Sequence, residues 1–144
     1  MKIAAVQMVS TPRWADNQAS ARALLEQAAA QGVELAVLPE YFGAIGARDT
    51  DKLALREAPG EGPMQAFLAE TARALGLWIV GGTVPLATQD PHKVRNTVLV
   101  HAPSGDCVAR YDKIHLFRFD NGSERYNEGS VIEPGSAPVQ FSLH

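Results

Sequence analysis

Short apolar runs alternate with an amphipathic segment in the first forty residues of the chain. Residues 3–8 (IAAVQM) form an apolar run that predicts a strand buried on both faces of a sheet. Residues 17–31 carry apolar side chains at steps of three and four positions, which predicts a helix. Residues 33–38 (VELAVL) return to a strand pattern. The order strand, helix, strand predicts a β-α-β unit whose two strands are parallel.

Capping residues mark the expected ends of two helices. Asp16 or Asn17 is expected to cap the first helix, and Gly32 stands where a left-handed residue ends it. A second helix is expected to begin at Pro63, because proline is favoured in the first helical turn, and to end at Gly76. The β-α-β order therefore repeats once along the chain.

Three further apolar runs extend the predicted sheet. Residues 77–84 (LWIVGGTV) predict a strand, in which Gly81 and Gly82 indicate a bulge or the close approach of another part of the chain. Residues 96–101 and 107–111 predict two strands joined by a turn with proline, serine and glycine. This hairpin adds antiparallel pairing, so the fold class is α/β with a mixed sheet.

Three segments complete the pattern. Residues 43–62 are mixed and charged, and we expect an irregular connection over one end of the sheet. Residues 119–135 (FDNGSERYNEGSVIEPG) are polar and are expected to form a loop, whereas residues 138–143 (PVQFSL) predict one more strand. The chain shows neither an internal repeat nor a linker, so one domain is expected.

Composition and charge exclude several classes of function. The 144 residues are 46% hydrophobic and 20% charged, which is typical of a compact soluble domain. A formal net charge of −3 disfavours nucleic-acid binding, since it leaves no excess of cations to neutralise phosphates. No apolar run approaches the roughly 18 residues that a membrane span requires, so we expect a cytoplasmic protein with no membrane partner. The single cysteine, Cys107, has no internal disulfide partner, in agreement with a reducing compartment.

Two ionisable residues directly follow predicted strands. Glu40 follows the strand at 33–38 and stands beside Tyr41 and Phe42 in an apolar setting, and Lys113 follows the second strand of the hairpin. Ligand sites of open α/β sheets lie beyond the carboxyl ends of strands, where a glutamate and a lysine can neutralise each other. Solvated surface ions without any chemical role are the alternative that this spacing leaves open. The four histidines show no spacing typical of metal ligands, so no metal site is expected.

These residues lie in segments that resemble the signature motifs of the nitrilase superfamily, the carbon-nitrogen hydrolases. The opening strand at 3–8, LPEYF around Glu40 and YDKIHLF around Lys113 are similar to the first strand, the glutamate motif and the lysine motif of the family, in that order. RYNEGSVIEPG resembles a segment that carries a second glutamate near the site, here Glu128. The KIHLF segment and the E-P-G element are most similar to the branch of omega-amidases and deaminated-glutathione amidases.

The resemblance implies a mechanism without a cofactor that acts on a small-molecule amide. Glu40 is then the general base and acid, Lys113 stabilises the oxyanion, and Glu128 positions the lysine or assists proton transfer. A cysteine thiolate attacks the amide or nitrile carbon, ammonia leaves, and water hydrolyses the thioester. Tyr41, Phe42 and His115 are candidate substrate-lining residues, the last with a hydrogen bond near the lysine.

The nucleophile of the family follows the lysine by a few tens of residues, and no cysteine follows Lys113 in this sequence. Cys107 precedes it within a predicted strand, where a small structural side chain is the expected role. We therefore expect residues 1–144 to form one incomplete domain that ends before the nucleophile and is inactive by itself. The alternative is a truncated, non-catalytic module of the same fold that binds a small molecule or serves assembly.

The resemblance also implies the architecture and the assembly. The family fold is a four-layer α-β-β-α sandwich, of which this chain is expected to be the N-terminal half, with a mixed sheet and its helices on one face. Such a half leaves one apolar sheet face uncovered, so we expect a homo-oligomer or association through that face.

Overall fold

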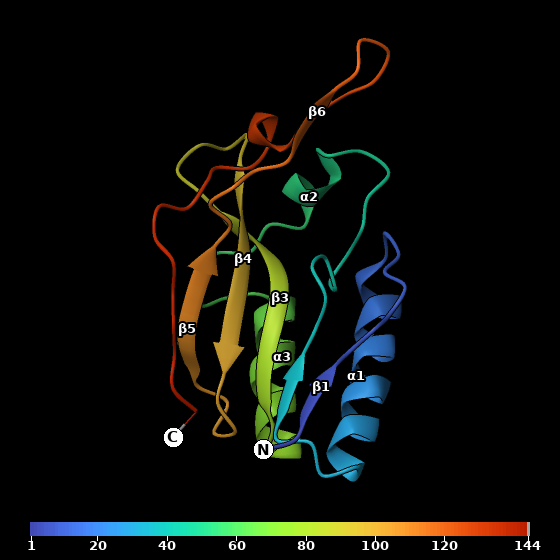
Figure 1. Cartoon of the computed structure of the whole chain (residues 1–144), viewed down its shortest axis with the longest axis vertical. Coiled ribbons are helices and arrows are strands. Elements are labelled where there is room, and N and C mark those ends of the chain that lie inside the picture. Colours follow the sequence, from blue (N-terminus) through green and yellow to red (C-terminus); the bar gives the residue numbers. More distant parts are fainter. Residues whose placement is uncertain (144) are drawn as a thin grey trace.

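A mixed five-stranded sheet organises the structure, a computed structural model that describes residues 1–143 (Figure 1). In chain order its strands are β1 (Ile3–Ala5), β2 (Leu35–Val37), β3 (Trp78–Ala87), β4 (Val94–His101) and β5 (Cys107–Asp112). They lie side by side in the same order, β1-β2-β3-β4-β5. The pairs β1/β2 and β2/β3 are parallel, and the pairs β3/β4 and β4/β5 are antiparallel. The carboxyl ends of strands β2, β3 and β5 therefore all lie at the same end of the sheet.

Two long helices, α1 (Trp14–Ala30) and α3 (Pro63–Leu75), cover one face of this sheet, as expected. Helix α3 begins at Pro63 and ends at Gly76, whose φ of 63° is the left-handed conformation that glycine adopts most easily. Helix α1 begins earlier than predicted, at Trp14, and the side chain of its N-cap residue Arg13 makes no capping hydrogen bond. The prediction of a cap at Asp16 or Asn17 was therefore wrong.

Asn17 instead lies inside helix α1 and is buried. Its side-chain oxygen accepts the N–H of Thr11 at 2.8 Å, and its amide donates to the carbonyl oxygens of Thr11 and Gly43, each at 2.8 Å. The buried amide pairs with backbone groups of two loops and so stabilises the fold, because unpaired buried polar groups are costly. Asn17 thus joins the loop before α1 to the loop after β2.

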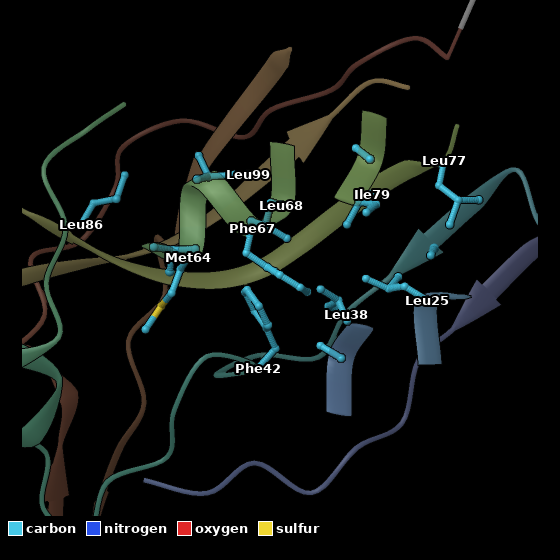
Figure 2. Close-up of a cluster of buried hydrophobic side chains, with 14 residues drawn as sticks. Leu25, Leu38, Phe42, Met64, Phe67, Leu68, Leu77, Ile79, Leu86 and Leu99 are labelled. Carbon is cyan, nitrogen blue, oxygen red and sulfur yellow. The ribbon is translucent and has the colours of Figure 1, made fainter. Parts of the chain in front are cut away.

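The core lies between the helices and the sheet (Figure 2). Leu25 of α1 and Phe67 of α3 are almost fully buried and belong to one cluster with Ile79 of β3. Each such side chain stabilises the fold by about 1.5–3 kcal/mol relative to an exposed one. The sheet residues of the cluster come from one face, and no helix among residues 1–143 covers the opposite face.

Gly81 of β3 lies against the side chain of Leu68 from helix α3. A Cβ atom at this position would overlap the end of the Leu68 side chain, so any larger residue requires Leu68 to shift. The pairing of β3 with β4 shifts its register between Gly82 and Val84. Of the two alternatives expected for this glycine pair, the bulge is confirmed, whereas the close neighbour of Gly81 is the side chain of Leu68 and not another backbone segment.

Strand β1 is not buried on both faces, contrary to the prediction. It forms one edge of the sheet and pairs only with β2 among the described strands, and the side chain of Ile3 is 55% exposed. An apolar run has the same sequence signature at an edge as in the centre of a parallel sheet, which is why the pattern misled us.

The loop predicted at 119–135 contains a hairpin and was partly wrong. Strands β6 (Arg118–Asp120) and β7 (Arg125–Asn127) pair antiparallel and project away from the sheet in Figure 1. The side-chain oxygen of Asn121 accepts the N–H groups of Ser123 and Glu124 at 3.0 and 2.7 Å and so closes the turn. The exposed, charged strands lack the apolar alternation that marks a half-buried strand.

The connections and the C-terminal segment differ in two further respects. The irregular segment 43–62 includes a short helix, α2 (Asp51–Ala54). Residues 138–143 form no strand, so that prediction was wrong; instead the ring of Phe141 stacks on Trp78 of β3 at 6.4 Å between centroids. Among residues 1–143, no helix has the length and apolar character needed to cross a membrane.

Candidate active site

Glu40 and Lys113 meet at the edge of the sheet where β2 and β5 end. Glu40 follows β2 after two residues and Lys113 follows β5 directly. The Lys113 Nζ atom donates a hydrogen bond to Glu40 Oε1 at 3.1 Å, although 73 positions separate the two residues. The two ends are brought together because β2 and β5 run in the same direction across the sheet.

Glu128 joins this pair from the 3-10 helix η1 (Glu128–Ser130), which follows the projecting hairpin. Its Oε2 and Oε1 atoms lie 3.0 and 3.2 Å from Lys113 Nζ. Lys113 therefore has a carboxylate on each of two sides. Burial opposes the charged form of Lys113, but hydrogen bonds to Glu128 and Glu40 outweigh it and raise the pKa of Lys113 above its ordinary value.

The Glu128 side chain is 14% exposed, and its carboxylate accepts hydrogen bonds on both oxygens. The N–H of Phe117 donates to Oε2 at 2.6 Å, and the Tyr41 hydroxyl donates to Oε1 at 3.2 Å. Burial alone would raise the pKa of Glu128, but the Phe117 N–H, the Lys113 ammonium and the Tyr41 hydroxyl together lower it. The main-chain N–H of Glu128 also donates to the Phe117 carbonyl at 3.0 Å, so the two ends of the hairpin are tied together.

Asn96 of β4 belongs to the site and was not predicted. It is 4% exposed, and its Nδ2 atom donates to Glu40 Oε1 at 2.7 Å and to the Tyr41 hydroxyl at 3.4 Å. The main-chain carbonyl oxygen of Asn96 accepts a hydrogen bond from the main-chain N–H of Lys113 at 2.9 Å. The available signal was an amide side chain at the start of an apolar strand, since a buried amide needs a polar partner.

The structure places the three candidate substrate-lining residues differently. Tyr41 borders a cavity of about 180 Å³ together with Glu128. Phe42 is 0% exposed and packs against Phe67 with 6.3 Å between ring centroids, so its expected contact with substrate is corrected to a core role. His115 is exposed, and within residues 1–143 it makes no hydrogen bond, so the expected bond near the lysine is not formed.

The environment of Glu40 is polar on one side and open on the other. Its side chain is 48% exposed, so the expected enclosure by apolar neighbours is not found. It borders a cavity of about 260 Å³ on the sheet face without helices, together with Lys113 and the side chains of Val80, Val98 and Tyr111. Glu40 and Lys113 thus present a carboxylate and an ammonium to a mainly apolar hollow.

Cys107 lies at the opposite end of strand β5 from this cluster. It is the first residue of β5, whereas Lys113 follows the last, so about 20 Å of extended chain separates them. Burial raises the pKa of its thiol, only partly offset by contacts with the backbone of Ala109 and Val100. Cys107 therefore is no partner for Glu40, and it is exposed at the start of the edge strand β5.

The described part of the chain, residues 1–143, holds no group of three or more histidine, cysteine or acidic side chains arranged for a metal ion. A half-exposed carboxylate can accept a proton, and an ammonium held beside it can stabilise a developing negative charge.

The profile of the carbon-nitrogen hydrolase family matches residues 2–143. The chain belongs to the carbon-nitrogen hydrolase family. It is 35% identical over 141 residues to an omega-amidase from Danio rerio, which covers 97% of this chain and 50% of that protein. It is 36% identical over 141 residues to a deaminated glutathione amidase from Synechocystis, with 96% and 51% covered. This carbon-nitrogen hydrolase chain therefore spans about half the length of the relatives it matches.

Solved structures of carbon-nitrogen hydrolases share the fold. The NitFhit protein of C. elegans superposes with a TM-score of 0.82 at 27% identity and covers 95% of this chain and 34% of its own. A CN-hydrolase superfamily protein from Xanthomonas campestris, with an arsenic adduct in its active site, gives a TM-score of 0.72 at 34% identity and covers 95% and 47%. The predicted family, its omega-amidase and deaminated-glutathione amidase relatives and the α/β fold are confirmed.

Proposed function

We propose that this chain supplies the acid-base and charge-stabilising part of a thiol-dependent amidase. The observation that carries the proposal is the Lys113 ammonium held between Glu40 and Glu128 at 3.0–3.2 Å. In the reaction, an amide is converted to a carboxylate and ammonia through a thioester.

Each residue of the cluster has one task in this reaction. Glu40 takes the proton from a cysteine thiol, and the thiolate then forms a bond to the amide carbon. The negative charge moves to the amide oxygen, where Lys113 stabilises it. Glu40 returns the proton to the nitrogen so that ammonia leaves, and then activates the water that cleaves the thioester. Glu128 keeps Lys113 in place.

The thiol comes from polypeptide beyond these 144 residues. Cys107 is the only cysteine in the sequence, and it lies at the far end of β5 from Glu40 and Lys113. A further segment that brings a cysteine to the cavity bordered by Val80 and Val98 completes the site. The chain alone is therefore expected to be inactive.

The proposed substrate is a small molecule with a terminal primary amide group. The names of two relatives, omega-amidase and deaminated glutathione amidase, support an amide of this kind. A cavity of about 260 Å³ next to Glu40 supports a small molecule rather than a polymer. Assembly through the sheet face without helices and a cytoplasmic location stay predictions.

The test compares the 144-residue chain with the product of the complete open reading frame that contains it, in an assay of ammonia release from small ω-amides. The longer protein is expected to release ammonia and the 144-residue chain is not. Glu40→Gln and Lys113→Met are each expected to lower kcat by about 100-fold or more. Cys107→Ser is the matched control and leaves the rate unchanged.

The outcomes are decisive for separate parts of the proposal. Full activity in Glu40→Gln or Lys113→Met rejects the role of that residue. Loss of activity in Cys107→Ser, or ammonia release by the 144-residue chain, rejects an external thiol. A longer protein that releases no ammonia but binds the amide identifies a non-catalytic module and overturns the amidase proposal.

A further inference from the structure

Tyr41, the residue next to Glu40, has an unusual backbone conformation. Its φ is 57°, and among residues 1–143 it is the one residue other than glycine with a positive φ. The left-handed region costs an ordinary side chain roughly 1–2 kcal/mol, and a bulky aromatic residue occupies it rarely. Such a conformation persists where surrounding contacts hold it, often beside a functional site.

Several contacts hold Tyr41 in this conformation. Its main-chain N–H donates to Thr83 Oγ1 at 3.1 Å, which fixes the backbone next to Glu40. The Lys52 ammonium lies 5.1 Å from the centre of the Tyr41 ring, within the range of a cation-π contact. Its hydroxyl donates to Glu128 at 3.2 Å. The side chain is therefore directed at Glu128 and not at the open cavity beside Glu40.

The Tyr41 hydroxyl closes a ring of hydrogen bonds. Asn96 donates to Glu40 at 2.7 Å and Lys113 donates to the same Glu40 oxygen at 3.1 Å. Lys113 also donates to Glu128 at 3.2 Å, and Glu128 accepts from Tyr41, whose hydroxyl accepts from Asn96 at 3.4 Å. Each of the five side chains thus contacts two others in the ring, and removal of the Tyr41 hydroxyl opens it.

Electrostatics keep the Tyr41 hydroxyl in the donating form. Burial, followed by the negative charges of Glu128 and Glu40, raises the pKa of Tyr41 far above its ordinary value of 10.0. The phenol therefore remains protonated at every pH at which the enzyme would work. The hydroxyl in turn contributes to the lowered pKa of Glu128, after the Phe117 N–H and the Lys113 ammonium.

We propose that Tyr41 is a positioning residue that fixes the Glu128 carboxylate, and through it the Lys113 ammonium beside Glu40, without contacting the substrate. The inference rests on the proposed amidase function for its consequence in catalysis, but its structural part stands on the ring of contacts alone. Without the hydroxyl, Glu128 Oε1 keeps Lys113 as its one side-chain donor among residues 1–143, and the Phe117 N–H on Oε2 is then the remaining fixed donor to the carboxylate besides Lys113 itself. Lys113 then loses a fixed partner and its ammonium moves relative to Glu40.

The first test uses Tyr41→Phe in the 144-residue chain, with Tyr126→Phe as the matched control, since Tyr126 lies 53% exposed on the projecting hairpin. Carboxyl-detected NMR titration is expected to show that the pKa of Glu128 rises toward its ordinary value in Tyr41→Phe and is unchanged in Tyr126→Phe. An unchanged Glu128 pKa in Tyr41→Phe overturns the proposal. Because this readout needs no turnover, it is independent of whether the protein is an amidase.

The second test measures kinetics in the product of the complete open reading frame. Tyr41→Phe is expected to lower kcat about tenfold with little change in KM, because the hydroxyl acts on Lys113 and not on the bound amide. In a Glu128→Gln background the same change should have little further effect, since the two residues act in series. A rise in KM at constant kcat identifies Tyr41 as a substrate contact instead and overturns the positioning role.

Discussion

The Nδ2 atom of Asn96 donates a hydrogen bond to Glu40 Oε1 at 2.7 Å across 56 positions of sequence. The main-chain carbonyl oxygen of the same Asn96 accepts a hydrogen bond from the main-chain N–H of Lys113 at 2.9 Å. One residue of strand β4 therefore fixes the side chain of one member of the pair and the backbone of the other. This arrangement places the carboxylate and the ammonium relative to the sheet and to each other.

Substitution of Asn96 is expected to weaken the fold in a way that depends on charge. Asn96→Ala removes a buried donor and should lower the free energy of unfolding by about 1–3 kcal/mol. Asn96→Asp should lower it further, because it places a second carboxylate beside Glu40 in place of the donor. Urea unfolding at pH 7 measures both. Equal stability of the two variants would contradict a direct contact with the Glu40 carboxylate.

The ion cluster predicts a window of pH in which it stabilises the protein. The pKa of Glu128 is lowered below 4.5, so its contribution is present above about pH 4.5 and is lost as the pH falls through the folded value. The pKa of Lys113 is raised above 10.5, so its contribution is present below pH 10.5 and is lost as the pH rises through the folded value.

Urea unfolding of the native protein and Glu128→Gln across this range checks the window. The difference between the two is expected to be constant near neutral pH and to shrink below pH 4.5. Glu124→Gln on the exposed hairpin serves as the control and should follow the native protein. A difference that grows on acidification would refute the assigned sign.

His101 predicts a separate loss of stability in mild acid. Burial lowers the pKa of His101 from 6.5 to about 4, and its Nδ1 atom has no hydrogen-bond partner among the described residues. The unfolded chain therefore binds a proton first, and stability should fall by up to about 3 kcal/mol as the pH drops from 6.5 to 4. His101→Asn should flatten this dependence, whereas the exposed His92→Asn should keep it. The measurement is thermal unfolding at closely spaced pH values.

The contact between Gly81 and Leu68 predicts compensation between two substitutions. Gly81→Ala forces a Cβ into the Leu68 side chain and is expected to destabilise the protein by about 1–3 kcal/mol. Leu68→Ala alone leaves a cavity and should cost about 2–5 kcal/mol. In the double variant the new methyl group enters that cavity, so the loss should be smaller than the two added together. If the two changes in the free energy of unfolding simply add in the double variant, Leu68 and Gly81 are not in contact.

The sheet face without helices predicts association. Val80 and Val98 border the cavity on that face, and exposed apolar surface of this kind favours contact with other molecules. Val98→Lys is expected to shift the 144-residue chain toward monomer in sedimentation velocity, whereas Val9→Lys, at an 87% exposed position away from this cavity, should leave the distribution unchanged. A native chain that sediments as a monomer would rule out association through this face.

Much of the sheet and the central pair of the site followed from the sequence. Glu40 and Lys113 each stand directly beyond an apolar run, and strands that run in the same direction end at one edge, so their approach was predictable. Helix α3 was predictable because Pro63 and Gly76 mark its two ends with opposite backbone preferences.

Residues whose role depends on tertiary contacts were not predictable. Asn17 has the side chain of a helix cap, yet it lies within the helix because two loops that are distant in sequence offer it better partners. The side chain of Asn96 contacts Glu40 and Tyr41 across 56 and 55 positions, and the Tyr41 hydroxyl contacts Glu128 across 87. Phe42 belongs to the LPEYF segment in sequence, but after the left-handed residue Tyr41 its side chain is buried in the core.

The tie between Phe117 and Glu128 has a practical consequence for the hairpin that lies between them. Hydrogen bonds between Phe117 and Glu128 anchor both ends of residues 118–127 at the site. Motion at the tip of the hairpin is therefore expected to leave Lys113 in place. Insertions, deletions or substitutions at this tip are therefore expected to leave the geometry of the charged cluster unchanged. The same anchoring makes the Asn121 turn a suitable place for a fluorescent label or an affinity peptide.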